Sequence, residues 1–187
     1  HLFVYFKQTG IYEKERTIFS LTPTFSHSLT RMGSAIGTLI QPMGLAFDSS
    51  GNLFCVDQEN HHLFHISKTG VSLTRFGGWG NSPGTFKYPV SVQIDGQGNI
   101  YVVDMNNQRV QKFSPDGNFL LTCGDHEAED QRLGKMAFSS SIDRQGNLWV
   151  TDASRQRIQV YGSDGKLIQS VSPKDIEQPI GICSLEN

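Results

Sequence analysis

Short apolar stretches alternate with turn-forming segments along most of the chain. In the first clear unit, the stretches cover residues 43–47, 53–56, 63–66 and 71–76. They are rich in Val, Ile, Leu and aromatic residues, and the last two alternate apolar with polar positions, as expected of strands. No stretch carries a convincing apolar period of about 3.6 residues. The pattern therefore predicts four short strands rather than helices.

This unit of four strands is repeated. A ten-residue segment has three copies, which are Asp48–Asp57, Asp95–Asp104 and Asp143–Asp152. The aspartates that end these copies are 47 and 48 residues apart. A Gly-Asn pair inside each copy, and a glycine at 70, 117 or 165, supply turns that need positive φ. Four antiparallel strands repeated about every 45 residues are typical of propeller blades.

Two further segments place the repeat in a known group. Gln41–Gly44 carries a Pro-x-Gly motif before the first strand, and Asn107–Phe113 reads Asn-x-Arg-[apolar]-Gln-x-Phe. The first copy departs with His62 in place of Arg, and the third has Met136–Ser139 where Pro-x-Gly would stand. Over residues 41–172 the pattern resembles the NHL repeat. The resemblance implies an all-β β-propeller of four-stranded NHL-like blades.

The repeat also predicts where the blades begin and end. The expected units are a weakly matching partial blade (1–40), three full blades (41–88, 89–135 and 136–177) and the first strand of a closing or next blade (178–187). The N-terminal part and the last segment could together form a split fourth blade, which would close a four-bladed ring. The alternative is a part of a six-bladed ring, the number that the resemblance favours. The chain begins at His1 rather than Met, so we expect that a preceding segment was removed by processing or truncation.

Recurring charged residues flank the hairpin between the second and third strands. Asp104 ends one strand and Arg109 begins the next, and Asp152 and Arg157 repeat the arrangement. We expect structural ion pairs here, because a ring needs only one active site and the pair recurs. No catalytic residue is predicted. His61 and His65 lie about 13 Å apart on a strand, so no metal or other cofactor is predicted.

The loops between strands two and three, and those between blades, differ from blade to blade, whereas the turns at the opposite end are near copies. Binding residues tend to lie on individual loops held by a rigid scaffold. We therefore expect a protein partner on the variable loop face. The candidate contact residues are Trp79, Tyr88, His61, Asn107, Glu127, Glu129 and Arg155. The acidic stretch around Glu127 favours a basic protein surface.

Charge and composition narrow the function further. The chain has 187 residues, 16 Lys+Arg against 18 Asp+Glu and a net charge of -2, which makes a nucleic-acid partner unlikely. No apolar run approaches the length of a membrane span, and no motif indicates a small-molecule substrate. We expect a non-catalytic binding or scaffold module. The alternatives are a propeller lyase or lactonase with a metal, and an RNA-binding NHL domain. The compartment stays open, with an extracytoplasmic or secreted setting marginally favoured.

Overall fold

The computed structural model describes residues 39–125, 131–172 and 178–184, and these residues form three four-stranded antiparallel sheets. The first sheet contains β1 (Pro42–Phe47), β2 (Leu53–Asp57), β3 (His62–Ile66) and β4 (Ser72–Gly77). The second contains β5 (Pro89–Ile94), β6 (Ile100–Asp104), β7 (Arg109–Phe113) and β8 (Phe119–Cys123). The third contains β9 (Ala137–Ile142), β10 (Leu148–Asp152), β11 (Arg157–Tyr161) and β12 (Leu167–Val171). We call these sheets blades 1, 2 and 3.

The strands follow one another in chain order within each blade. The expectation of an all-β chain with three full blades is therefore confirmed. The only helical segments among the described residues are two 3₁₀ turns, η2 (Met105–Asn107) and η3 (Ala153–Arg155). No helix in these ranges is long and apolar enough to cross a membrane. The partial N-terminal blade expected at residues 1–40 lies almost wholly outside the described residues.

The Asp-x-x-Gly-Asn motif makes the turn between the first and second strands of each blade. In blade 2, Asp95 Oδ1 accepts hydrogen bonds from the N–H groups of Gln97 at 3.0 Å and Asn99 at 2.8 Å. The Asn99 side chain donates back to Asp95 Oδ2 at 2.8 Å. Gly98 has a φ of 84°, which is why this position needs glycine. The motif is thus explained as a turn rather than a site.

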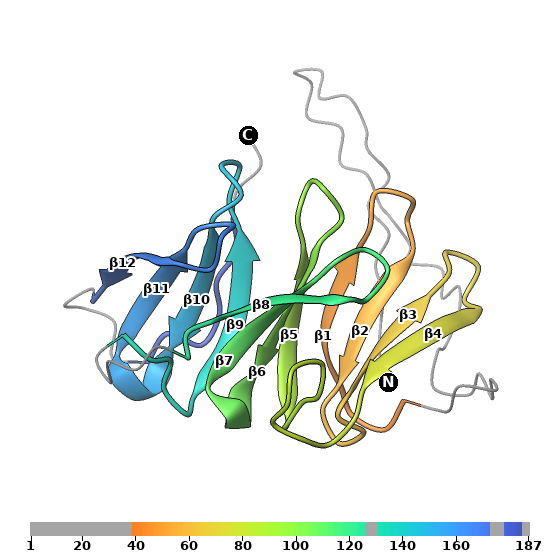
Figure 1. Cartoon of the computed structure of the whole chain (residues 1–187), viewed down its shortest axis with the longest axis horizontal. Coiled ribbons are helices and arrows are strands. Elements are labelled where there is room, and N and C mark those ends of the chain that lie inside the picture. Colours follow the sequence, from red (N-terminus) through yellow and green to blue (C-terminus); the bar gives the residue numbers. More distant parts are fainter. Residues whose placement is uncertain (1–38, 126–130, 173–177, 185–187) are drawn as a thin grey trace, which may run out of the picture.

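The blades are joined by apolar clusters between neighbouring sheets. The cluster between blades 1 and 2 contains Phe54, Val56, Leu63, Phe86, Val92, Ile100, Val102 and Phe113. The cluster between blades 2 and 3 contains Val90, Tyr101, Val103, Val110, Cys123, Leu133, Ala137, Leu148, Val150 and Tyr161. The inner strands β1, β5 and β9 are neighbours, and Figure 1 shows the three sheets side by side. Burial between sheets holds the blades together, because apolar area is removed from water there.

Glycine permits the close approach of the first two inner strands. A Cβ atom added at Gly44 would lie 2.7 Å from the Cα of Ser91, closer than such atoms approach one another in proteins. The Pro-x-Gly motif of the first repeat is therefore a packing feature. The last described segment, 178–184, runs along β9, where the N–H of Ser184 donates to Ser141 Oγ at 2.8 Å. It is not a strand of the β9–β12 sheet.

Candidate functional site

The loops that differ between blades lie at one end of the sheets, the lower end in Figure 1. This end, which we call the loop face, carries the loops 58–61, 105–108 and 153–156, the blade linker 78–88, and the described parts of the next linker, 124–125 and 131–136. The two kinds of loop touch one another. The N–H of Tyr88, at the end of the first linker, donates to Nδ1 of His61 at 3.2 Å. The loop face is therefore one connected surface around blades 1 and 2.

Three predicted contact residues gather on this surface. The ring of His61 lies edge-on to Trp79, with centroids 4.6 Å apart, and edge-on to Tyr88 at 4.9 Å. Trp79 and Tyr88 make a third edge contact at 5.9 Å. These geometries are the ones that aromatic pairs prefer. We call His61, Trp79 and Tyr88 the aromatic cluster.

The aromatic cluster is open to solvent and carries a cation. Trp79 is 61% exposed, an unusual state for the largest apolar side chain. The ammonium group of Lys87 lies 5.6 Å from the centroid of the Trp79 ring, within the range of a cation–π contact. Lys87 is a site residue that the sequence did not reveal. Its position directly before Tyr88 is the signal that could have found it.

Backbone geometry sets the positions of these rings. His61 and Tyr88 have φ values of 56° and 53°, a left-handed conformation that few non-glycine residues adopt. The carbonyl of His61 accepts a hydrogen bond from Gly78 at 2.8 Å. Within the linker, Phe86 is fully buried between blades 1 and 2, and its N–H donates to the Gly78 carbonyl at 2.8 Å. Phe86 therefore anchors the linker in the apolar cluster between blades 1 and 2, while Trp79 remains exposed to solvent.

The imidazole of His61 is neutral in this arrangement. Its Nδ1 accepts a hydrogen bond from a backbone N–H, which requires an unprotonated nitrogen. Burial lowers the pKa of His61, and the neighbouring His62 lowers it further. Glu59, Asp57 and Asp104 act in the opposite direction. The net effect is a lowered pKa, so the neutral form dominates at neutral pH.

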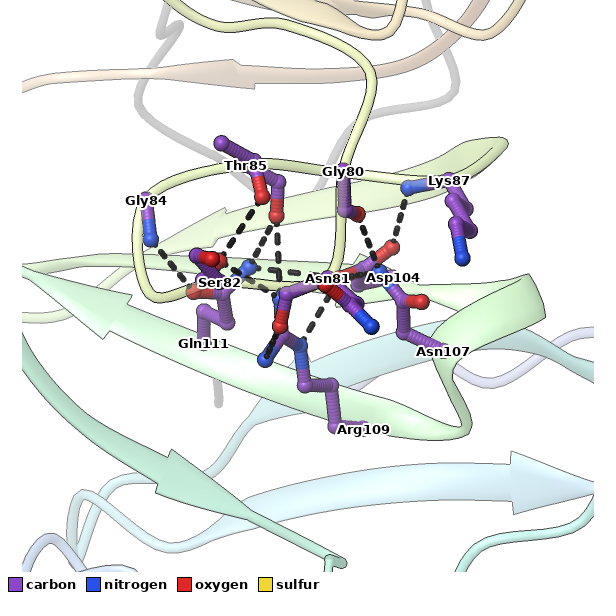
Figure 2. A network of polar contacts seen from close by, with 10 residues as sticks. All are labelled: Gly80, Asn81, Ser82, Gly84, Thr85, Lys87, Asp104, Asn107, Arg109 and Gln111. Carbon is purple, nitrogen blue, oxygen red and sulfur yellow. Dashed lines mark hydrogen bonds and ion pairs between the residues drawn. The ribbon is translucent and has the colours of Figure 1, made fainter.

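A polar network beneath the linker holds it against blade 2 (Figure 2). Arg109 Nε donates to Asp104 Oδ2 at 2.9 Å. The other guanidinium nitrogens donate to three linker carbonyls, those of Asn81 at 2.9 Å, Ser82 at 3.0 Å and Thr85 at 3.0 Å. The guanidinium group of this predicted ion pair therefore also binds the backbone of the linker.

Asp104 and two amides complete this network. Asp104 Oδ1 accepts from the N–H of Lys87 at 2.7 Å, and its side chain is fully buried. Gln111 accepts from the N–H of Gly84 at 2.9 Å and donates to the Thr85 carbonyl at 2.8 Å. Burial raises the pKa of Asp104, although the hydrogen bonds that it accepts from Lys87, Asn107 and Arg109, and the charge of Arg109, oppose the rise. The oxygens of the Asp104 carboxylate are thus occupied by contacts that hold the linker.

Asn107, which the sequence marked for partner contact, belongs to the same network. Its amide donates to the carbonyl of Gly80 at 2.9 Å and to Asp104 Oδ2 at 2.8 Å. Figure 2 shows it below the linker among the other network residues. The sequence did not reveal that Asn107 and Gln111 share one task. The recurrence of Arg-x-Gln at residues 109–111 and 157–159 was the available signal.

Blade 3 repeats the arrangement on the next linker. Arg157 Nε donates to Asp152 Oδ2 at 3.1 Å, and another of its nitrogens donates to the carbonyl of Arg132 at 2.6 Å. Gln159 donates to the carbonyl of Gln131 at 3.0 Å. Arg155, another predicted contact residue, also donates to the Arg132 carbonyl, at 2.5 Å. Both arginines therefore fasten the linker that precedes blade 3.

Blade 1 lacks the arginine. Asp57 instead accepts from the N–H groups of Ile40 at 2.6 Å and Gln41 at 3.0 Å, and from the Asn60 amide at 2.8 Å. Nδ1 of His62, which stands in the arginine position, contacts the carbonyl of Asn60. In blade 3, Asp152 likewise accepts from the N–H of Gly134 at 3.1 Å. The buried aspartate therefore holds the chain before the blade in all three repeats, with or without arginine.

His65 lies apart from the aromatic cluster. His65 stacks on Phe54, with centroids 4.2 Å apart, and it does not join His61. Glu127 and Glu129 lie outside the described residues. Among the residues that the structure describes, no three His, Cys, Asp or Glu side chains are grouped so that they could hold a metal ion. Cys55 and Cys123 are buried free thiols, and Cys183 is an exposed one.

Comparison with known proteins bears on the fold. Residues 86–113, which contain Phe86, Asp104 and Arg109, match the family model of the NHL repeat. The chain is similar to an inactive variant of virginiamycin B lyase from Staphylococcus aureus solved with quinupristin (TM-score 0.60, 12% identity, 76% of this chain and 45% of that chain). It is also similar to a chain of a nidogen/laminin complex (0.61, 17%, 83% and 54%) and to Kuenenia stuttgartiensis hydrazine synthase (0.61, 15%, 80% and 41%).

These comparisons define the class of the protein. The chain carries an NHL repeat within a propeller fold, so the resemblance seen in the sequence is confirmed. The chain spans about half the length of the solved structures it matches, or less. At these identities the likeness concerns the fold alone. A search of the curated proteins returns no significant match.

Proposed function

We propose that this propeller segment is a non-catalytic module that binds a protein partner through its loop face. The observation that carries the proposal is the aromatic cluster, where three residues from two loops meet at an exposed tryptophan. Trp and Tyr are the side chains that most often dominate protein interfaces. A tryptophan left largely in water has a physical reason to bind a partner, because burying it removes a large apolar surface from solvent.

The contacts of the polar residues around the cluster favour a role in positioning the linker rather than in catalysis. Asp104, Arg109 and Gln111 direct their polar atoms at the linker backbone or at one another. Such a network keeps the loop in one conformation before a partner arrives. A preformed loop loses less conformational entropy on binding. Asn107 and Arg155 act in the same way, as residues that position the surface.

A fold neighbour supports this reading by analogy. One similar structure was solved as part of a nidogen/laminin complex, so a propeller of related fold takes part in a protein assembly. We propose a protein partner for this chain as well. We also assign Glu127 and Glu129 of this chain to the surface that contacts the partner. Two carboxylates there favour a partner with a basic region opposite them.

The second candidate is a propeller lyase, and the likeness to virginiamycin B lyase favours it. Fold alone does not decide function, since one architecture supports unrelated activities. Metal content after dialysis against a chelator separates the two proposals. One retained equivalent of a divalent metal would support the lyase, whereas the binding module requires none.

The binding proposal is tested by capture with matched surface variants. The chain is immobilised as wild type, as Trp79→Ala and as Ile168→Ala, and proteins captured from a source extract are quantified by mass spectrometry. Ile168 is the control, because it is 58% exposed but lies on β12 away from the cluster. We expect one or more proteins to be captured by wild type and the control but lost with Trp79→Ala.

The opposite face provides the second control. Ser50 and Asp116 are exposed residues in the uniform turns. If capture survives Trp79→Ala and is lost when Ser50 or Asp116 is replaced by Lys, the partner binds the other face and the proposal is wrong.

A further inference from the structure

The aromatic cluster contains a titratable group at a position where the other blades have none. The residue that closes the loop between the second and third strands is His61 in blade 1, Gln108 in blade 2 and Gln156 in blade 3. All three have left-handed backbone conformations, with φ of 56°, 55° and 52°. Because glutamine serves equally well in this turn, the turn itself does not explain the imidazole.

The contacts of His61 are what distinguish it. Its carbonyl and its ring both bind the linker, the first through the N–H of Gly78 and the second through the N–H of Tyr88. The ring also supports Trp79 and Tyr88 by edge contacts. His61 is therefore the side chain that joins blade 1 to the exposed part of the linker 78–88.

Protonation would break this junction. An imidazolium carries hydrogen on both nitrogens, so Nδ1 could no longer accept from the N–H of Tyr88. Two donors would then face each other at 3.2 Å. Histidine is the side chain whose charge changes most readily near neutral pH.

The charged groups around His61 come from three elements. Its own loop and the adjoining strand ends contribute Glu59, Asp57 and His62, and blade 2 contributes Asp104. The linker contributes Lys87, whose ammonium lies by Trp79. Asp57 and Asp104 are buried and already accept several hydrogen bonds. Glu59 is the exposed carboxylate among these groups, and a protonated His61 ring would be attracted to it.

We propose that His61 is a pH-sensitive latch of the docking surface: its neutral ring holds Trp79 and Tyr88 in place, and its protonation releases them. The inference rests on the proposed function, since it assigns regulation to the same aromatic cluster. The protein would bind its partner at neutral pH and release it in an acidic medium. Burial keeps the pKa of His61 below its ordinary value of about 6.5, so release occurs on the acidic side of that value.

Tryptophan fluorescence measures the latch without any partner. The chain has two tryptophans, and Trp149→Phe leaves Trp79 as the only reporter. Phe is a matched replacement because Phe54 occupies the equivalent place in blade 1. Emission and quenching by acrylamide are then recorded from pH 8 to pH 4.5, with circular dichroism to confirm that the sheets stay folded. We expect one step in Trp79 emission below about pH 6.5.

His61→Gln is the decisive variant, since it places in blade 1 the residue that blades 2 and 3 carry. The step should disappear in this variant and persist in His65→Gln, whose ring lies on Phe54 instead. Absence of a step in the parent, or its survival in His61→Gln, would overturn the latch. A change that coincides with loss of the sheet signal would also overturn it, as the latch opens within a folded chain.

Capture at two pH values then links the latch to binding. Partner affinity should fall at least about fivefold between pH 7.5 and pH 5.5, the lower end of typical coupling between sites. In His61→Gln the affinity should not change between these values. The two proposals fail separately. Loss of pH dependence with intact dependence on Trp79 removes only the latch, whereas capture that ignores Trp79 removes the docking surface even if the fluorescence step is present.

Discussion

Blade 1 and blade 2 hold the chain before them in different ways, although both use a buried aspartate. In blade 2, Asp104 works with Arg109, and the guanidinium reaches three carbonyls of the linker. In blade 1, Asp57 has an Asn60 amide as its side-chain partner, and His62 occupies the arginine position. The aspartate is therefore the common element, and in blade 2 the arginine adds contacts to the linker 78–88.

The difference teaches what the recurring charges are for. A buried ion pair between two side chains alone contributes little to folding stability, because the cost of desolvating both charges offsets their attraction. In blade 2 the pair instead satisfies backbone groups of residues 81–87. Its role is to fix the linker that carries Trp79. The recurring acids and arginines hold the linkers, and the individual loops form the docking surface that we propose.

Removing the aspartate should have the largest effect. Asp104→Ala leaves the buried Arg109 without its carboxylate and the N–H of Lys87 without an acceptor, so we expect a loss of about 3 kcal/mol in the free energy of unfolding. Asp57→Ala strands no buried cation and should cost less, about 1–2 kcal/mol. Urea denaturation measures both. Equal losses would contradict the distinction between the two blades.

A milder change tests the linker contacts of the guanidinium. Arg109→Lys keeps the charge, but one ammonium cannot reproduce a planar fork that serves Asp104 and three carbonyls. We expect about 1–2 kcal/mol of destabilisation and faster hydrogen exchange at Gly84 and Lys87. The same replacement at exposed Arg75 should change neither. Unaltered exchange in the linker would show that the guanidinium does not fasten it.

Acid should weaken blade 1 more than blade 2. Burial lowers the pKa of His61 and of His65, and blade 2 contains no histidine in its strands. Because the unfolded chain binds these protons more readily, the contribution of both groups is present above about pH 6.5 and is lost as the pH falls. Hydrogen exchange, corrected for intrinsic rates, should show lower opening free energies in β3 at pH 5.5 than at pH 7.5. An equal decrease in β7 would contradict this.

Much of the fold follows from local sequence. The Gly-Asn turns and the alternating stretches each lie within one hairpin, and the intervals of 47 and 48 residues show that this pattern recurs from blade to blade. Together they predict three blades. The proximity of Asp104 and Arg109 follows from the same hairpin, since the two residues are directly opposite in the β6–β7 register. Local patterns of this kind need no knowledge of distant contacts.

The site depends on information that the local pattern lacks. Arg109 and Gln111 bind carbonyls 24 to 28 residues away, and a carbonyl has no residue identity to recognise. The contact between His61 and Tyr88 depends on a left-handed backbone conformation at both residues. Neither residue is glycine, so the sequence carries no turn motif that predicts this contact. Sequence reasoning named the three aromatic residues as candidates, and only the fold placed them in contact.

The central claim is that Trp79 docks the partner while the network beneath it only holds the loop. The most direct test is the dissociation constant of the captured partner for wild type and Trp79→Ala, measured by titration calorimetry at pH 7.5 with thermal unfolding recorded in parallel. The account predicts about 30-fold weaker binding, as for an interface residue worth about 2 kcal/mol, with an unchanged Tm because Trp79 is 61% exposed. An unchanged dissociation constant, at the same Tm, would contradict it.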